Sequence, residues 1–202
     1  FKKPIILSTG MNDIPSIKIS VQILEKYQVP YALLHCVSLY PTPYNKVYLG
    51  ALNDFKKTFP NAVIGLSDHS VGNYTALASV ALGASILEKH FTSSKSWPGP
   101  DIAVSIDPKE LADLVKGSDA IHQALGGKKV ILKEEQPTIN FAYACVVSIK
   151  DIKKGEKFSK KNIWVKRPGT GEIKAVSFKK VLGKIANKDI PNDMQIKWSD
   201  IK

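Results

Sequence analysis

The stretch AVIGLSDHSVGNYTALASVALGASILEKHF, residues 62–91, decides the fold. It begins and ends with short apolar runs, residues 62–67 and 85–91, and this pattern predicts two buried strands. Between them, residues 74–82 are small and apolar at helical spacing, which is typical of a helix packed closely on a sheet. A strand, a helix and a second strand predict two parallel strands joined by a crossover helix.

The same alternation continues on both sides of this stretch. We expect strands over residues 4–9 and 31–39 and helices over residues 16–28, 47–59 and 108–125. Asp107 is the expected N-cap of the last helix, and two glycines end it. Four strand–helix units predict an α/β fold with a parallel sheet covered by helices. A complete (β/α)₈ barrel needs about 250 residues, so a 202-residue chain is too short to hold one.

The alternation stops after Pro137. Residues 145–202 contain the apolar stretches CVVSI, IWVKR, KVLGK and QIKWS, separated by the turn-forming sequences KKGE, RPGTGE and PND. This pattern predicts a small β-rich domain. We therefore expect an α/β domain over residues 1–136, a linker over 137–144 and the small domain over 145–202.

The chain carries a net charge of +11, and this charge is concentrated in the tail. Residues 141–202 hold 15 Lys+Arg and 6 Asp+Glu, a net +9, whereas residues 1–140 hold 14 and 12, a net +2. The tail lysines are scattered rather than interleaved with stacking aromatic residues, so we expect no nucleic acid partner. A solvated surface or the attraction of a small anionic substrate explains the charge better.

Composition also bears on the cellular location. The longest apolar runs, such as residues 78–87, have about ten residues, and a membrane span needs roughly 20. The first residues show no apolar segment followed by a cleavage site, so we expect no secretory signal. Two cysteines, Cys36 and Cys145, do not make a disulfide scaffold. We expect a cytoplasmic protein that does not bind membranes.

Each predicted strand of the first domain ends in polar residues, and chemistry in parallel α/β folds gathers at such ends. His69 and His90 each follow an apolar strand, and the two strands are consecutive. Neighbouring strands lie about 4.8 Å apart, so the two imidazoles could bind one divalent cation such as Mn²⁺, Fe²⁺ or Zn²⁺. The alternative is two unrelated surface histidines.

Hydroxyl and carboxyl groups occur at the same strand ends. Ser8, Ser38 and Ser67, together with backbone N–H groups where helices begin, could bind a phosphate or a carboxylate. Each serine could equally be a cap or turn residue. The carboxylates Glu88 and Asp101 could bind sugar hydroxyls, act as general acid or base, or form an ion pair with the neighbouring lysine.

Six ordered motifs together resemble one known family. They are KPIILSTGM (3–11), YALLHCVSLYPTPY (31–44), IGLSDHS (64–70), ILEKHFT (86–92), GPDIAVSIDP (99–108) and VKRPGTG (165–171). The chain resembles the sialic acid synthases, that is, N-acetylneuraminate synthases and their legionaminic and pseudaminic acid relatives. The resemblance implies the second half of a TIM barrel, followed by a tail like the antifreeze-like or SAF domain.

The resemblance implies a metal-dependent condensation. Enzymes of this family join phosphoenolpyruvate to the open-chain aldehyde of an N-acetylmannosamine-type sugar, and they release phosphate and a nine-carbon 2-keto acid. His69 and His90 match the two metal-binding histidines of the family, for which Mn²⁺ is the most plausible ion. Ser8 and Ser67 match positions that hold the phosphoenolpyruvate anion. Ser38 stands where some members carry asparagine.

Further residues are assigned by the same resemblance. Tyr40 lies beside the phosphoenolpyruvate site, while Glu88 and Asp101 match carboxylates at the acceptor sugar. Arg167 matches an arginine that the tail presents to the barrel mouth, and Phe141 falls where the family places an aromatic residue against the sugar. The tail is expected to cover the active site of the other subunit in a domain-swapped homodimer.

The family also has an upstream half-barrel that contributes to both substrate sites. We therefore expect this chain to be the C-terminal part of a longer protein. Two other classes of function remain open at this point. One is another metal-dependent aldol-type lyase on the same barrel, and the other is a non-catalytic fragment that binds a carbohydrate or a protein. The residues leave the acceptor sugar open.

Overall fold

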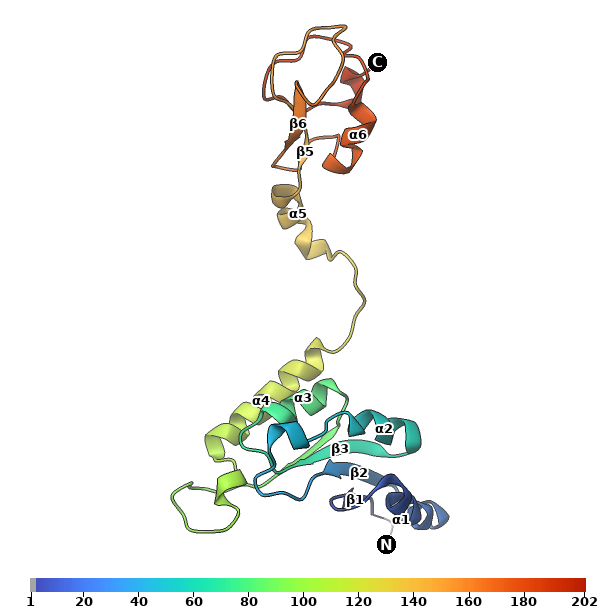
Figure 1. Cartoon of the computed structure of the whole chain (residues 1–202), viewed down its shortest axis with the longest axis vertical. Coiled ribbons are helices and arrows are strands. Elements are labelled where there is room, and N and C mark those ends of the chain that lie inside the picture. Colours follow the sequence, from blue (N-terminus) through green and yellow to red (C-terminus); the bar gives the residue numbers. More distant parts are fainter. Residues whose placement is uncertain (1–2) are drawn as a thin grey trace. The chain divides into compact units, whose positions relative to one another are not determined.

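The structure is a computed structural model that describes residues 3–202, and it divides between Gly127 and Lys128 into two compact units (Figure 1). We call residues 3–127 the barrel unit and residues 128–202 the tail unit. The strands of the barrel unit are β1 Ile5–Ser8, β2 Tyr31–Cys36, β3 Val63–Asp68 and β4 Ile86–Lys89. Its α-helices are α1 Ile14–Lys26, α2 Ala51–Thr58, α3 Tyr74–Ala81 and α4 Pro108–Ala124.

The four strands form one parallel sheet in the order β1-β2-β3-β4. Each helix follows its strand in sequence, and the helices cover one face of the curled sheet (Figure 1). All four carboxyl ends therefore lie along the same edge. This arrangement confirms the expected half of a TIM barrel.

The main core of the barrel unit lies between the sheet and its helices. Leu33 of β2 and Ile64 of β3 pack against Ile17 of α1 and Phe55 of α2, all of them buried. Side chains alternate between the two faces of a strand, so the apolar residues at every second position supply this layer. Burial of these side chains removes apolar area from water and holds the helices on the sheet.

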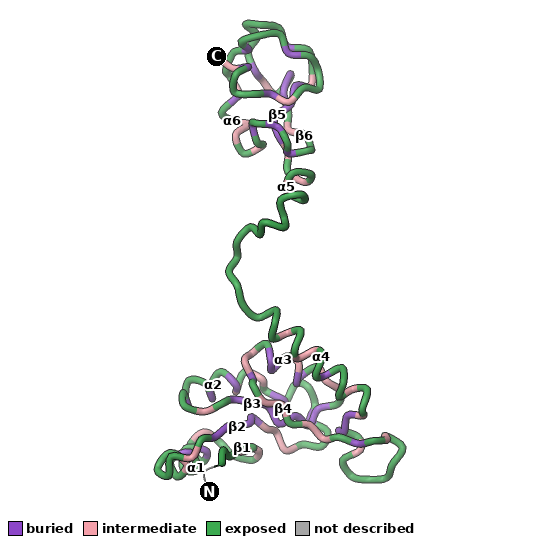
Figure 2. The backbone as a smooth tube through the Cα atoms, turned by 180° about the vertical axis from the view of Figure 1, so that it is seen from behind, coloured by how far each residue is buried: buried purple, intermediate pink, exposed green. Residues whose placement is uncertain are grey.

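The two outer strands are more exposed than the two inner ones (Figure 2). Five of the six residues in β2 and five of the six in β3 are buried, whereas β1 has none. In β1 the side chain of Ile6 is 57% exposed and that of Ile5 is 41% exposed. Within the described part of the chain, β1 pairs only with β2 and β4 only with β3, so both edges of the sheet are open.

Two expected helix boundaries can be compared with the structure. The helix expected over residues 47–59 begins only at Ala51, because Tyr48 has a left-handed backbone with φ +52° and a 3₁₀ turn, Tyr44–Lys46, precedes it. The expected cap of α4 is confirmed. Asp107 Oδ1 accepts from the backbone N–H of Glu110 at 2.8 Å, and Glu110 Oε2 accepts from the backbone N–H of Asp107 at 3.0 Å.

We predict that Glu110→Gln makes the barrel unit less stable at pH 7 and that this difference disappears in acid. The Lys95 ammonium, 2.6 Å away, and the Asp107 backbone N–H lower the pKa of Glu110 below its ordinary value. The carboxylate therefore stabilises the fold above the unfolded pKa of about 4.3, and the stabilisation is lost as pH falls through the lower folded pKa. Urea unfolding of both proteins at pH 7 and pH 3 measures this, and an equal difference at both pH values would contradict it.

The tail unit has its own core. Strand β5, Cys145–Ser148, pairs antiparallel with β6, Ile163–Lys166, and single bridges and turns complete the unit. The buried core residues are Val146, Ile152, Phe158, Ile163, Ile173, Val181, Ala186, Ile190 and Ile196. A separate core explains why this part folds as a unit of its own.

Two segments of the tail differ from the expected secondary structure. Most of the expected linker 137–144 is helix α5, Gln136–Ala142, since Pro137 lies in the first turn, where a helix accepts proline. The apolar stretch KVLGK, expected in a β-rich setting, begins in the short helix α6, Phe178–Val181. Among residues 3–202, no helix combines the length and the apolar character that crossing a membrane requires.

Candidate active site at the carboxyl edge of the sheet

Three aromatic rings meet at the carboxyl ends of β2, β3 and β4. The ring centroids of His69 and His90 lie 5.2 Å apart. Tyr40 stacks on His69 with a centroid distance of 4.1 Å and stands edge-on to His90 at 5.7 Å. The strand register brings the two histidines together as their positions in the sequence predicted.

The orientation of His69 leaves one ring nitrogen available. Its Nδ1 lies 2.9 Å from the backbone carbonyl of Val37 and 3.9 Å from the Sγ of Cys36. A carbonyl oxygen only accepts, so Nδ1 carries the proton and donates it, and Nε2 keeps a free lone pair. The carbonyl of His69 accepts from the backbone N–H of Thr42 at 2.9 Å. The ring and the backbone of His69 are thus both held by the loop after β2.

His90 is more exposed and lies between two pockets. Its Nδ1 is 3.7 Å from Asp101 Oδ2, a distance too long for a hydrogen bond. One pocket, of about 240 Å³, is lined by both histidines together with Ser67, Glu88 and Lys89. An adjoining pocket of about 390 Å³ contains His90 and Asp101. Asp101 therefore lies at the same edge as the histidines, as expected.

Glu88 holds two of the predicted anion-binding hydroxyls. Its Oε1 accepts from Ser67 Oγ at 2.6 Å and from Ser8 Oγ at 3.3 Å. Residues on strands at opposite edges of the sheet, Ser8 and Glu88, are thereby joined across its open face. The ion pair of Glu88 with Lys89, one of the alternatives considered for this carboxylate, is absent from the described ion pairs, because neighbouring strand residues point to opposite faces.

Ser38 lies in the loop after β2 and is half-buried. A Cβ atom added at Gly10, in the loop after β1, would collide with the Oγ of Ser38. The absence of a side chain at Gly10 therefore lets these two loops approach each other. Ser38 and Ser8 are in this way brought to the same end of the sheet.

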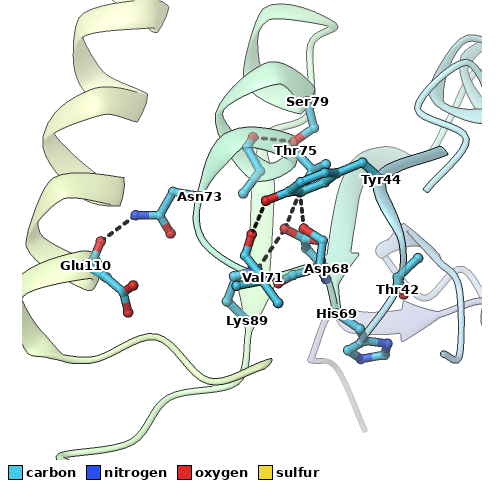
Figure 3. A network of polar contacts seen from close by, with 12 residues as sticks. Thr42, Tyr44, Asp68, His69, Val71, Asn73, Thr75, Ser79, Lys89 and Glu110 are labelled. Atoms are coloured by element: carbon cyan, nitrogen blue, oxygen red, sulfur yellow. Dashed lines mark hydrogen bonds and ion pairs between the residues drawn. The ribbon is translucent and has the colours of Figure 1, made fainter. Parts of the chain in front are cut away.

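A buried polar network that includes Asp68 and Lys89 lies beside His69 (Figure 3). Lys89 Nζ donates to Asp68 Oδ2 at 2.9 Å, and the side chains of this pair are 3% and 1% exposed. Asp68 also accepts from Thr75 Oγ1 at 2.6 Å and from the backbone N–H of Ser70 at 2.9 Å. This ion pair was not among the residues predicted from the sequence. The sequence does contain a sign of it, since two residues of opposite charge each stand next to a predicted metal-binding histidine.

The environment of Tyr40 keeps its phenol protonated. Burial, and next the nearby Cys36, Asp101 and Glu88, raise the pKa of Tyr40 above its ordinary value. A protonated phenol can donate a hydrogen bond to an anion or to a carbonyl oxygen. Tyr40 therefore offers a donor beside the two imidazoles.

The remaining two predicted residues belong to the tail unit. Arg167 is exposed in the turn that follows β6, and Phe141 in α5 has a side chain that is 70% exposed. A Cβ atom at Gly169 would collide with the backbone of Tyr143, and the N–H of Gly169 donates to the carbonyl of Asn140 at 2.8 Å. The turn that carries Arg167 is therefore packed against the segment that carries Phe141.

The two imidazoles are the candidate metal donors at this edge of the sheet. Within residues 3–202, no three His, Cys, Asp or Glu side chains group closely enough to hold an ion. Two imidazoles remain, one of them with its Nε2 lone pair oriented by a hydrogen bond. Such a pair fits a divalent cation whose other ligands are water and substrate oxygens.

Comparison with known families agrees with this fold. Residues 1–130 match the NeuB family and residues 143–202 match the SAF domain. A half-barrel followed by a separate SAF unit defines the class. The chain belongs to the NeuB family.

Several characterised or solved proteins are similar to it. The N,N'-diacetyllegionaminic acid synthase of Campylobacter jejuni is 43% identical over 96% of this chain and 59% of its own length. A pseudaminic acid synthase of C. jejuni is 36% identical over 100% of this chain and 58% of its own length. The N-acetylneuraminic acid synthetase structure from Leptospira borgpetersenii is 41% identical, with a TM-score of 0.61, over 66% of this chain and 47% of that one. The chain thus spans about three fifths of its curated relatives.

Proposed function

We propose that this chain is the catalytic C-terminal part of a sugar acid synthase. The reaction joins C3 of phosphoenolpyruvate to the aldehyde carbon of an open-chain N-acetylmannosamine-type sugar. Water adds at C2, and phosphate leaves to give a nine-carbon 2-keto acid. The observation that supports this most is the convergence of His69, His90, Tyr40 and Glu88 at one strand edge, in a chain related to synthases of this kind.

The two histidines are the proposed holders of a divalent cation, for which Mn²⁺ is the best candidate. His69 would use the Nε2 left free by its bond to Val37. When bound, the cation would polarise the aldehyde oxygen for attack by C3. His90 lines both pockets. This position favours a role for His90 between phosphoenolpyruvate and the acceptor sugar.

Ser8 and Ser67 are the proposed anchors of the phosphoenolpyruvate anion. In the structure both hydroxyls donate to Glu88, and a hydroxyl has a single proton to donate. Each would turn from Glu88 to the anion when phosphoenolpyruvate binds. Ser38, brought close by Gly10, would add a third hydroxyl, and Tyr40 would donate its phenol proton beside them.

The acceptor sugar is proposed to lie toward the adjoining pocket. Asp101 is in that pocket beside His90, and its carboxylate would accept from sugar hydroxyls, as would Glu88. Arg167 and Phe141 are proposed to come from the tail of a second subunit in a domain-swapped dimer. A guanidinium would donate to the N-acetyl carbonyl, and an exposed aromatic ring would pack against the sugar.

We also propose that a preceding half-barrel completes the site. The exposed isoleucines of β1 and the open edges of the sheet support this, because unpaired apolar strand edges favour association with further strands. The phosphoenolpyruvate and acceptor sites would then each be shared between the two halves of the barrel.

Phosphate release tests this function. A protein carrying this chain behind the half-barrel of a relative should release phosphate from phosphoenolpyruvate only when Mn²⁺ and an acceptor are both present. The acceptors to compare are N-acetylmannosamine and the two diacetamido sugars of the legionaminic and pseudaminic acid reactions. Release without any acceptor sugar, or release that resists a chelator, would contradict the proposal. A chain that binds sugar equally well after chelation would favour the non-catalytic alternative.

A further inference from the structure

We propose that the buried ion pair Asp68–Lys89 is a positioning device that sets the spacing of the two proposed metal-binding histidines. This inference rests on the proposed function, because it concerns the metal site of the same reaction. Asp68 immediately precedes His69, and Lys89 immediately precedes His90. The two charged residues are also register partners, since Asp68 of β3 is paired with Lys89 of β4.

Lys89 is hydrogen-bonded to both sequence neighbours of His69. Its Nζ donates to Asp68 Oδ2 at 2.9 Å and to the carbonyl of Ser70 at 2.6 Å. The residues before and after His69 are therefore both bonded to the residue that precedes His90. Figure 3 shows Asp68 and Lys89 close to each other and on one side of His69. A shift of β4 along β3 would break both bonds.

The rest of the network makes this attachment rigid. Asp68 Oδ1 accepts from the backbone N–H of Ser70, and Oδ2 accepts from Thr75 Oγ1 as well as from Lys89. Ser70 is 0% exposed and Asp68 is 2% exposed. Buried charges need several hydrogen bonds to offset the loss of water, and each carboxylate oxygen has at least one donor here. The network thus favours one arrangement of the loop that carries His69.

The direction of their side chains gives Asp68 and Lys89 a positioning role that differs from the metal-binding role of the histidines. Neighbouring residues on a strand point to opposite faces, so the buried pair of Asp68 and Lys89 lies on the other face of the sheet from Ser67 and Glu88. Lys89 also lines the pocket of the histidines, but its Nζ is bonded to Asp68 Oδ2 and to the carbonyl of Ser70. Asp68 and Lys89 are therefore positioning residues and not ligands. Residues that orient metal ligands from outside typically change metal affinity by about 10- to 100-fold when replaced.

The test measures Mn²⁺ binding to the 202-residue chain by the electron paramagnetic resonance signal of the free ion. The double variant Asp68→Asn/Lys89→Met removes both charges together and leaves no unpaired buried charge, so it is expected to fold. We expect its dissociation constant for Mn²⁺ to rise by about 10-fold or more. Leu52→Ala, which removes a fully buried side chain of α2, is the control for general loss of stability. We expect it to leave the dissociation constant unchanged.

Three outcomes separate the possibilities. Wild-type affinity in the double variant would overturn the positioning role. Equal weakening in Leu52→Ala would overturn it too, because the effect would then be one of overall stability. Failure of the wild-type chain to bind Mn²⁺ through His69 would instead contradict the proposed metal site. Near-ultraviolet circular dichroism of each variant establishes that the fold is retained.

Discussion

His69→Ala and His90→Ala are each expected to weaken Mn²⁺ binding by about 100-fold or more, since even outer partners of ligands cost about 10- to 100-fold. In the protein that carries this chain behind the half-barrel of a relative, phosphate release should fall by about 10³-fold or more. The reason is that polarisation of a carbonyl by a bound cation contributes several kcal/mol, and about 1.4 kcal/mol corresponds to a factor of ten in rate. Titration with Mn²⁺ and a phosphate-release assay measure the two effects.

The matched control for these variants is His122→Ala. His122 is exposed in the last turn of α4 and is remote in sequence from the strand ends. Its replacement should leave both Mn²⁺ affinity and phosphate release near their wild-type values. If the two histidine variants bound Mn²⁺ as tightly as His122→Ala does, the strand-edge histidines would not be the metal ligands.

The second large effect concerns stability. Lys89→Met alone should lower the free energy of unfolding of the barrel unit by about 3–5 kcal/mol, because it leaves Asp68 charged and buried without its cation. The double variant Asp68→Asn/Lys89→Met should recover much of this loss, since no unpaired charge remains. Urea denaturation followed by circular dichroism measures all three proteins.

Lys95→Met is the control for the stability effect. Lys95 pairs with Glu110, but the side chains of this pair are 42% and 33% exposed. Ion pairs that reach solvent contribute about 1 kcal/mol or less, so this variant should remain close to wild type. If Lys89→Met lowered the free energy of unfolding by no more than Lys95→Met does, burial would not make the Asp68–Lys89 pair important for stability.

Much of the fold could be predicted from local patterns. The apolar runs at β2 and β3 are continuous because both strands lie inside the sheet, where most of their residues are buried. Asp107 correctly predicted the start of α4, because N-capping is a contact between residues three positions apart. The start of α2 was missed, since the left-handed backbone of Tyr48 has no signal in apolar periodicity.

The site was predictable only in part, because sequence patterns report local contacts and not the partners of a side chain. The histidines and serines stand out because polar residues at the ends of apolar strands are visible in sequence order, and parallel strands place those ends at one edge. The partners of each group are not visible in this way. Glu88 joins Ser67 and Ser8 rather than its neighbour Lys89 because the pleat sends adjacent side chains to opposite faces.

The sequence by itself determined the alternation of strands and helices, the separate basic tail, the family resemblance and the edge at which polar groups gather. These properties follow from contacts near in sequence or from the pattern of apolar residues. Only the tertiary structure decided that Val37 orients His69, that Gly10 makes room for Ser38, and that Asp68 pairs with Lys89. These contacts join residues on different strands and loops, and their formation depends on strand register and side-chain direction, which are set when the sheet assembles.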